Sequence, residues 1–146
     1  MKASIFLCSL VLFIIGSCAQ PEKAAIEGSW QLVYGKWMQG DSLMGEFPGK
    51  FTVSDIKMWS KGHVLFVGWF KSDTIVMDSY GGGTYKLDGN QYEETLQYHV
   101  WKSAVGTTVK MLVEIKNDTL IQTWPLGNNG QVDKNNFSQE KYIRLD

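Results

Sequence analysis

The sequence predicts an all-β fold, an antiparallel up-and-down β-barrel of about eight to ten strands. Residues 81–124 hold four short runs in which apolar and polar side chains alternate, which is the period of a half-buried strand. An Asp-Gly pair at 88–89 and an Asn-Asp pair at 117–118 join these runs, and both pairs are typical of tight hairpin turns. Pairing the runs through these turns places one carboxylate on a face otherwise lined mainly by apolar and aromatic side chains. Such a face is expected on the inner wall of a small barrel.

Residues 1–17 are predicted to be a lipoprotein signal peptide. Lys2 precedes an apolar run from Ala3 to Ile15, which is shorter than the roughly 20 residues that a membrane-spanning helix needs. The segment Ile15-Gly16-Ser17-Cys18 resembles a bacterial lipobox, so we expect cleavage before Cys18 and lipid attachment to it. The expected location is the bacterial cell envelope, with the lipid in the membrane and the domain on the periplasmic side or at the cell surface. The alternative is an ordinary secretory signal cleaved near Ala19.

The cysteine count agrees with an anchor. Cys8 lies inside the apolar run and is expected to be removed with it. Cys18 is then the only thiol, so the mature chain has no internal disulfide. Residues 18–27 are predicted to be a short polar tether, and residues 28–146 to be one barrel domain.

The first strand is predicted at residues 28–34, where Trp30, Leu32 and Tyr34 share one face. Residues 38–49 contain glycine and lack a clear period, so we expect a loop over one mouth of the barrel. The apolar side chains of Leu43 and Met44 suggest that this loop folds over the opening as a lid. A short helix packed on the end of the barrel is an equal alternative.

A strand pair is predicted at residues 51–59 and 63–71, joined by a turn at 61–62. This turn places Trp59 opposite Val64, Lys57 opposite Phe66 and Asp55 opposite Gly68, because facing residues share a side of the sheet. Either side of this pair is apolar enough to face inward, so the pattern leaves its orientation open. Residues 74–78 are predicted to form another short strand.

The Asp-Gly turn predicts a hairpin in which Tyr85 faces Tyr92 and Gly83 faces Glu94. A glycine beside a buried carboxylate leaves room for a water molecule or a ligand atom. The three glycines at 81–83 enter a strand rather than a helix, so they predict a sharp bend or bulge instead of a phosphate-binding loop. The predicted inward face of the next strand is Tyr92, Glu94, Leu96, Tyr98 and Val100.

A four-residue loop at 102–105 sets Leu96 opposite Met111 and Glu94 opposite Val113. The Asn-Asp turn then sets Val113 opposite Gln122. We therefore predict that Glu94 lies inside the barrel near Gln122, with Lys57 as its cation if that strand faces inward. A slip of one residue would turn Glu94 outward. The predicted ligand-binding residues are Glu94, Gln122, Tyr85, Tyr92, Tyr98, Leu96, Met111 and Val113.

Residues 125–136 are rich in Gly and Asn and predict a flexible loop before a last strand at 141–145. That strand carries Arg144, and the first strand opens with Gly28-Ser29-Trp30. Together with the stretch from Gly81 to Tyr98, these residues resemble the lipocalin-like, calycin-type lipoproteins of Bacteroidetes, a family of uncharacterised function. The resemblance implies a lipocalin-like barrel whose end is closed by Arg144 packed on Trp30. The chain is shorter than typical secreted lipocalins, so a ten-stranded barrel of the fatty-acid-binding type stays open.

The composition of the chain argues against one class of binding partner. The formal net charge is −1, and the charges are mixed without a basic cluster, which argues against a nucleic-acid partner. Six tryptophans and an aromatic content of 13% are suited either to core packing or to lining a pocket.

The sequence offers little for catalysis. Its two histidines are His63 and His99, and His99 is an odd number of residues from Glu94, so without a bulge the two face opposite ways. No HExxH, CxxC or catalytic-triad pattern is present, and we predict no catalytic residue, no metal site and no cofactor. Glu94 is the one acid–base candidate that the registers place inside.

Three functions follow from a barrel of this kind. The first is binding of a small apolar or amphipathic ligand, which requires an internal cavity of a few hundred cubic ångströms. The second is a structural or interaction lipoprotein whose barrel is filled by its own aromatic side chains. The third is a barrel enzyme that uses Glu94, which requires a second titratable group within hydrogen-bond reach of it.

Overall fold

The computed structural model describes residues 25–146, so the predicted signal peptide at 1–17 and the lipidation site Cys18 lie outside the described residues. Nine strands and one 3-10 turn make up the described part. They are β1 (Gly28–Gln39), β2 (Ser42–Phe47), β3 (Thr52–Ser60), β4 (His63–Ser72), β5 (Ile75–Asp88), β6 (Gln91–His99), η1 (Lys102–Ala104), β7 (Thr108–Lys116), β8 (Thr119–Trp124) and β9 (Asn136–Arg144).

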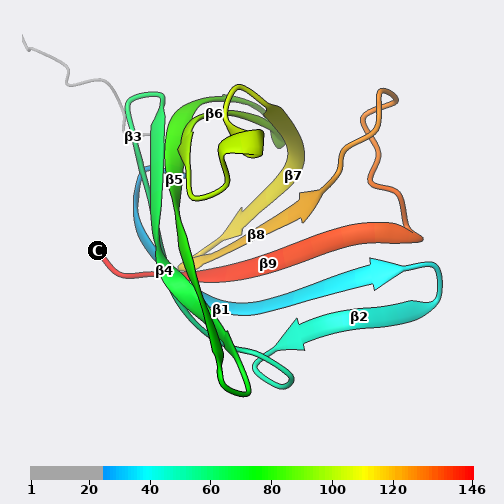
Figure 1. Cartoon of the computed structure of the whole chain (residues 1–146). Helices are drawn as coiled ribbons and strands as arrows, with labels where there is room; N and C mark the ends of the chain where they lie inside the picture. The colour runs from blue at the N-terminus through cyan, green and yellow to red at the C-terminus, as the bar shows by residue number, and fades with distance from the viewer. Residues whose placement is uncertain (1–24) are drawn as a thin grey trace, which may run out of the picture.

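The strands form a closed antiparallel up-and-down barrel, which confirms the predicted fold class (Figure 1). Eight strands, β1 and β3 to β9, follow one another around the wall, and pairing of β1 with β9 closes it. The extra strand β2 pairs with the second half of β1, while β3 pairs with the first half. The barrel is therefore eight-stranded, which decides between the lipocalin-like and ten-stranded alternatives in favour of the first.

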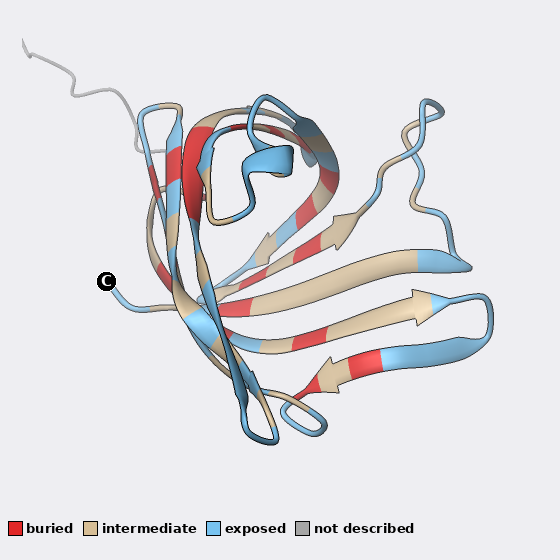
Figure 2. Ribbon diagram, in the orientation of Figure 1, coloured by how far each residue is buried: buried red, intermediate tan, exposed pale blue. Residues whose placement is uncertain are grey.

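The two ends of the barrel differ. One end, called here the closed end, carries two-residue turns at 61–62, 89–90 and 117–118, together with the start of β1 and the end of β9. The other end, called here the open end, carries the β1–β2 hairpin, the η1 segment and the connection between β8 and β9 (Figure 1). The buried segments of β8 and β9 lie toward the closed end, and their far ends are more exposed (Figure 2).

Two of the predicted registers are correct. Between β7 and β8, Val113 faces Gln122, and between β3 and β4, Lys57 faces Phe66. The structure also settles the orientation of β3, which the sequence left open. Asp55, Lys57 and Trp59 are buried inside, whereas Leu65 and Val67 of β4 are exposed on the outer wall.

The predicted pairings on either side of β6 are wrong. Glu94 faces Tyr85 on β5 rather than Gly83, because the turn is centred on residues 89–90 instead of 88–89. Glu94 faces Val109 on β7 rather than Val113, because the turn from β6 into β7 is centred on residues 101–102 instead of 103–104. Both errors shift the pairing by an even number of residues, so the face on which Glu94 lies is unchanged.

A β-bulge in β6 reverses the faces beyond it. Gly82 pairs with Tyr98 but Gly83 pairs with Leu96, so Gln97 is left without a partner on β5. The glycines on β5 permit this geometry, since a Cβ atom on Gly83 would lie 1.9 Å from the carbonyl oxygen of Thr95. After the bulge Tyr98 points outward and is 69% exposed, which corrects the prediction that it faces the interior.

The segment 38–49 is a hairpin and not the predicted loop. β1 continues to Gln39, Gly40 turns with a positive φ of 58°, and β2 returns along β1. A register shift at Met38 breaks the alternation, which explains why the sequence shows no period there. Phe47 at the end of β2 is fully buried, while Leu43 and Met44 stay exposed.

Candidate ligand-binding cavity

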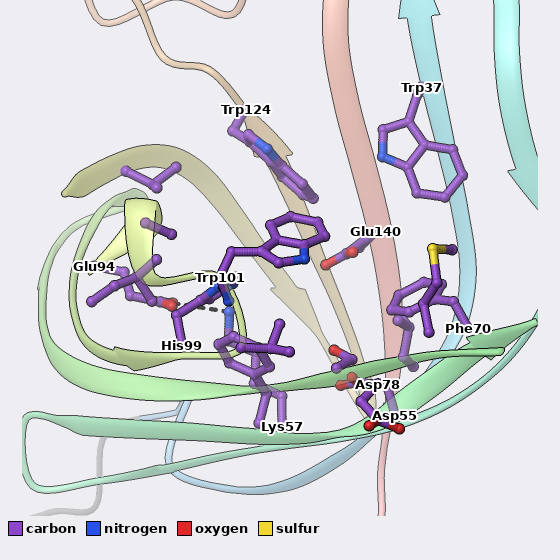
Figure 3. A pocket seen from close by; sticks show the side chains of 18 of the residues that line it. Trp37, Asp55, Lys57, Phe70, Asp78, Glu94, His99, Trp101, Trp124 and Glu140 are labelled. Atoms are coloured by element: carbon purple, nitrogen blue, oxygen red, sulfur yellow. Dashed lines mark hydrogen bonds and ion pairs between the residues drawn. The ribbon is translucent and has the colours of Figure 1, made fainter. Parts of the chain in front are cut away.

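A cavity of about 620 Å³ occupies the open half of the barrel (Figure 3). Its walls are mostly apolar and aromatic, and all nine strands and the η1 segment contribute lining residues. The described residues that form these walls include Trp37, Phe51, Phe66, Phe70, Leu96, Trp101, Val109, Met111 and Trp124. The closed half is filled instead, by a core that includes Trp30, Trp59, Tyr92 and Leu120.

A buried ion pair lies at the floor of the cavity. The Lys57 ammonium is 2.9 Å from Glu94 Oε2, and the two side chains are 7% and 3% exposed. The same oxygen accepts a hydrogen bond from the Tyr92 hydroxyl at 2.8 Å, and that hydroxyl accepts one from the Trp59 indole at 2.9 Å. The Lys57 ammonium also donates to Gln122 Oε1 at 3.4 Å. Glu94 is therefore inside, close to Gln122, with Lys57 as its cation.

Three more carboxyl groups line the cavity beside this network, those of Asp55, Asp78 and Glu140. Glu140 on β9 accepts a hydrogen bond from the buried Tyr142 hydroxyl and lines the cavity, as does Asp55 on β3. Burial raises the pKa of Glu140, although Tyr142 and the nearby Lys57 act in the opposite direction. Burial likewise raises the pKa of Asp55, against the effects of a Ser79 hydrogen bond and of Lys57.

Two buried polar atoms have no hydrogen-bond partner among residues 25–146. They are Oδ2 of Asp55 and Nε2 of Gln122. Asp55 is only 4% exposed and Gln122 is fully buried. Leaving a buried polar atom unpaired costs about 1–3 kcal/mol, so such atoms are rare without a functional or structural reason.

The structure brings together only part of the predicted ligand-binding set. Glu94, Leu96 and Met111 line the cavity. The other inward residues are buried or half-buried behind its floor, where Tyr85 stacks on Tyr92 with ring centroids 5.5 Å apart. The residues behind the floor are Tyr85, Tyr92, Val113 and Gln122. That any of the predicted residues contacts a ligand stays a prediction.

Several residues that line the cavity were not predicted from the sequence. Glu140 lies two and four residues before Tyr142 and Arg144, so it shares their inner face, but the last strand was predicted to begin after it. His99 turns inward only because of the bulge at Gln97, and its Nδ1 accepts the backbone N–H of Trp101 at 3.0 Å. The three glycines at 81–83 were predicted to mark a bend or bulge, but the prediction did not place the extra residue in β6 opposite them.

The closed end contains the contact implied by the family resemblance. The Arg144 guanidinium lies 4.1 Å from the centroid of the fully buried Trp30 ring. It donates to the backbone carbonyl of Glu27 at 2.9 Å and also to that of Ala25. The Trp30 indole donates to the carbonyl of Ile26 at 2.9 Å. Together these bonds hold the chain before β1 across the closed end.

Comparison of the chain with protein-family models, with curated proteins and with solved structures finds no match. Residues 25–146 contain no group of three or more His, Cys, Asp or Glu side chains that could hold a metal ion. The same part of the chain has no helix with the length and apolar character needed to span a membrane. The function is therefore inferred from the cavity and from the groups that line it.

Proposed function

We propose that the protein is a lipid-anchored β-barrel of the bacterial cell envelope that binds a small apolar or amphipathic ligand in its interior. The observation that carries this proposal is the cavity of about 620 Å³, which lies within the range of roughly 300–1,000 Å³ typical of small-molecule sites. A barrel filled by its own side chains would have no such space. Only the closed half of this barrel is filled in that way.

The lining supports a ligand with two unlike parts. Aromatic and aliphatic side chains form the walls toward the open end, while charged and hydrogen-bonding groups lie at the floor. An apolar body would displace water from the walls, and each square ångström of apolar surface removed from water contributes roughly 25 cal/mol. A polar group at the floor would then fix the orientation of the ligand.

A barrel enzyme that uses Glu94 is the second candidate. Lys57 and Tyr92 lie within hydrogen-bond reach of Glu94, as acid–base chemistry requires. Both, however, bind the same oxygen of Glu94, in a network that already includes Trp59 and Gln122. A group held in this way is better suited to supporting the cavity floor than to exchanging protons with a substrate, so binding is the preferred function.

Membership of the lipocalin-like lipoproteins is part of the same proposal. It is supported by the closed eight-stranded barrel and by the contact between Trp30 and Arg144. The anchor is supported by the sequence around Cys18. A short tether of this kind would keep the barrel close to the membrane surface.

Replacing Cys18 by alanine tests the anchor. Because the lipid is expected on this cysteine, Cys18→Ala should move the protein from the membrane fraction to the soluble fraction. The measurement is cell fractionation followed by mass spectrometry of the intact chain. A wild-type chain that is soluble and carries no lipid mass would contradict the anchor.

Titration with the neutral fluorescent probe N-phenyl-1-naphthylamine tests binding. We expect saturable binding to one site, and the variant Leu96→Trp should weaken it at least about tenfold, because the larger indole ring would project into the cavity. The matched control is Ile143→Trp, which adds the same ring to the exposed outer wall. Thermal unfolding of both variants checks that each is folded. Absence of saturable binding, or equal binding by folded variants, would overturn the proposal.

A further inference from the structure

We infer that the ligand of this cavity is a cationic amphiphile, with an ammonium-type group at the floor and an apolar or aromatic body against the walls. This inference rests on the proposed binding function and specifies the chemical class of the ligand. It starts from the balance of charge inside the barrel. Four carboxyl groups line the cavity, those of Asp55, Asp78, Glu94 and Glu140, and among the described lining residues the one lysine or arginine is Lys57.

Lys57 is already engaged. Its ammonium forms the 2.9 Å ion pair with Glu94 and lies 5.2 Å and 5.5 Å from the ring centroids of Trp59 and Phe66. Asp55 and Glu140 form no ion pair of their own within residues 25–146. An anionic head group would therefore meet a surplus of negative charge and no free cation on this floor.

Asp55 supplies an acceptor that lacks a donor. Asp55 lines the cavity, and its buried Oδ2 has no hydrogen-bond partner among residues 25–146. A hydrogen bond to a charged group is worth about 1.5–3 kcal/mol, roughly twice the value for a neutral pair. A ligand ammonium would supply both the donor and the countercharge that Asp55 and Glu140 lack.

The raised pKa values of Asp55 and Glu140 agree with this arrangement. Burial disfavours their charged forms, and a cation bound nearby would favour those forms again. The other titratable groups that line the cavity are Lys57, Asp78, Glu94, His99 and Tyr142, which come from β3, β5, β6 and β9. Lys57 is the one lysine or arginine among them.

The walls are also suited to a cation. Trp37, Trp101 and Trp124 project into the same cavity as the Glu140 carboxylate (Figure 3). The face of an indole ring attracts cations, and the attraction is worth about 0.5–2 kcal/mol depending on how far the site excludes water. Aromatic walls above a carboxylate floor therefore favour a positively charged group over a neutral group of equal size.

Three ten-carbon probes that differ only in head group test the inference. They are decylammonium, decan-1-ol and decanoate, each used below its micelle concentration to displace N-phenyl-1-naphthylamine from the full chain. We expect decylammonium to bind at least about tenfold more tightly than decan-1-ol, with decanoate the weakest. Glu140→Gln and Asp55→Asn should each reduce this preference severalfold, measured as the ratio of the decylammonium and decan-1-ol affinities within the same variant.

The outcomes separate this inference from the proposed function. If decan-1-ol or decanoate binds as tightly as decylammonium, the cationic class is wrong but the cavity still binds ligands. If folded Glu140→Gln and Asp55→Asn variants both keep the full preference for the cation, these carboxyl groups do not determine which head-group charge is bound. The inference then fails. If neither the naphthylamine nor any ten-carbon probe binds, both the proposed function and the inference fall.

Discussion

Trp30→Ala is expected to lower the free energy of unfolding by about 3–5 kcal/mol, the usual cost of removing a large buried ring. Trp30 is 0% exposed, its indole donates to the carbonyl of Ile26, and the Arg144 guanidinium lies over its ring. Truncation would leave a cavity at the closed end and release the segment before β1. The measurement is urea unfolding of the mature domain followed by far-UV circular dichroism.

Arg144→Met is the comparison for this substitution. It keeps an apolar side chain over the indole but removes the cation–π contact, worth about 0.5–2 kcal/mol, and the hydrogen bonds to the carbonyls of Glu27 and Ala25. A moderate loss of stability is therefore expected. If both variants unfold at the same urea concentration as the wild type, the closed end is not held by this contact.

Lys57→Met should cost a similar amount, about 3–5 kcal/mol near neutral pH, because it leaves a charge buried without its partner. Lys57 is 6% exposed and binds both Glu94 and Gln122. The matched control is the double variant Lys57→Met, Glu94→Leu, which replaces the whole pair by apolar groups. Replacement of both partners of a buried pair is often nearly neutral, so the double variant should recover most of the lost stability. A double variant as unstable as Lys57→Met would contradict this account of the floor.

The loss of stability caused by Lys57→Met should also depend on pH. Lys57 lowers the pKa of both Asp55 and Glu140, so its removal should raise these folded-state values further. A carboxyl whose pKa is higher in the folded state contributes stability below its unfolded pKa, about 4, and loses that contribution as pH rises through the folded value. Lys57→Met should therefore be more destabilising near pH 8 than near pH 4.

Much of the wall could be predicted because side chains alternate with a period of two. The pairings of Glu94 were wrong by even numbers of residues, and even shifts leave the face unchanged, so its inward position followed from the sequence. The same rule failed beyond Gln97. One unpaired residue reversed the faces, which moved Tyr98 outside and His99 inside.

The floor of the cavity was harder to predict for a different reason. Its groups meet from β3, β6, β8 and β9, so their proximity depends on closure of the barrel and not on any local pattern. The pairing of Lys57 with Glu94 required only the orientation of β3, and the sequence allowed for it. The position of Glu140 required the true start of β9, which lies behind a Gly- and Asn-rich loop with no periodic signal.

Native mass spectrometry of the protein purified from its own cells without detergent is the most direct test of ligand binding. We expect the native mass to exceed the mass of the same sample denatured in organic solvent, because a ligand bound in the cavity is lost on unfolding. The Leu96→Trp variant, with a larger ring in its cavity, should show a smaller fraction of the ligand-bound mass. Identical native and denatured masses for the wild-type protein would contradict a ligand-binding barrel.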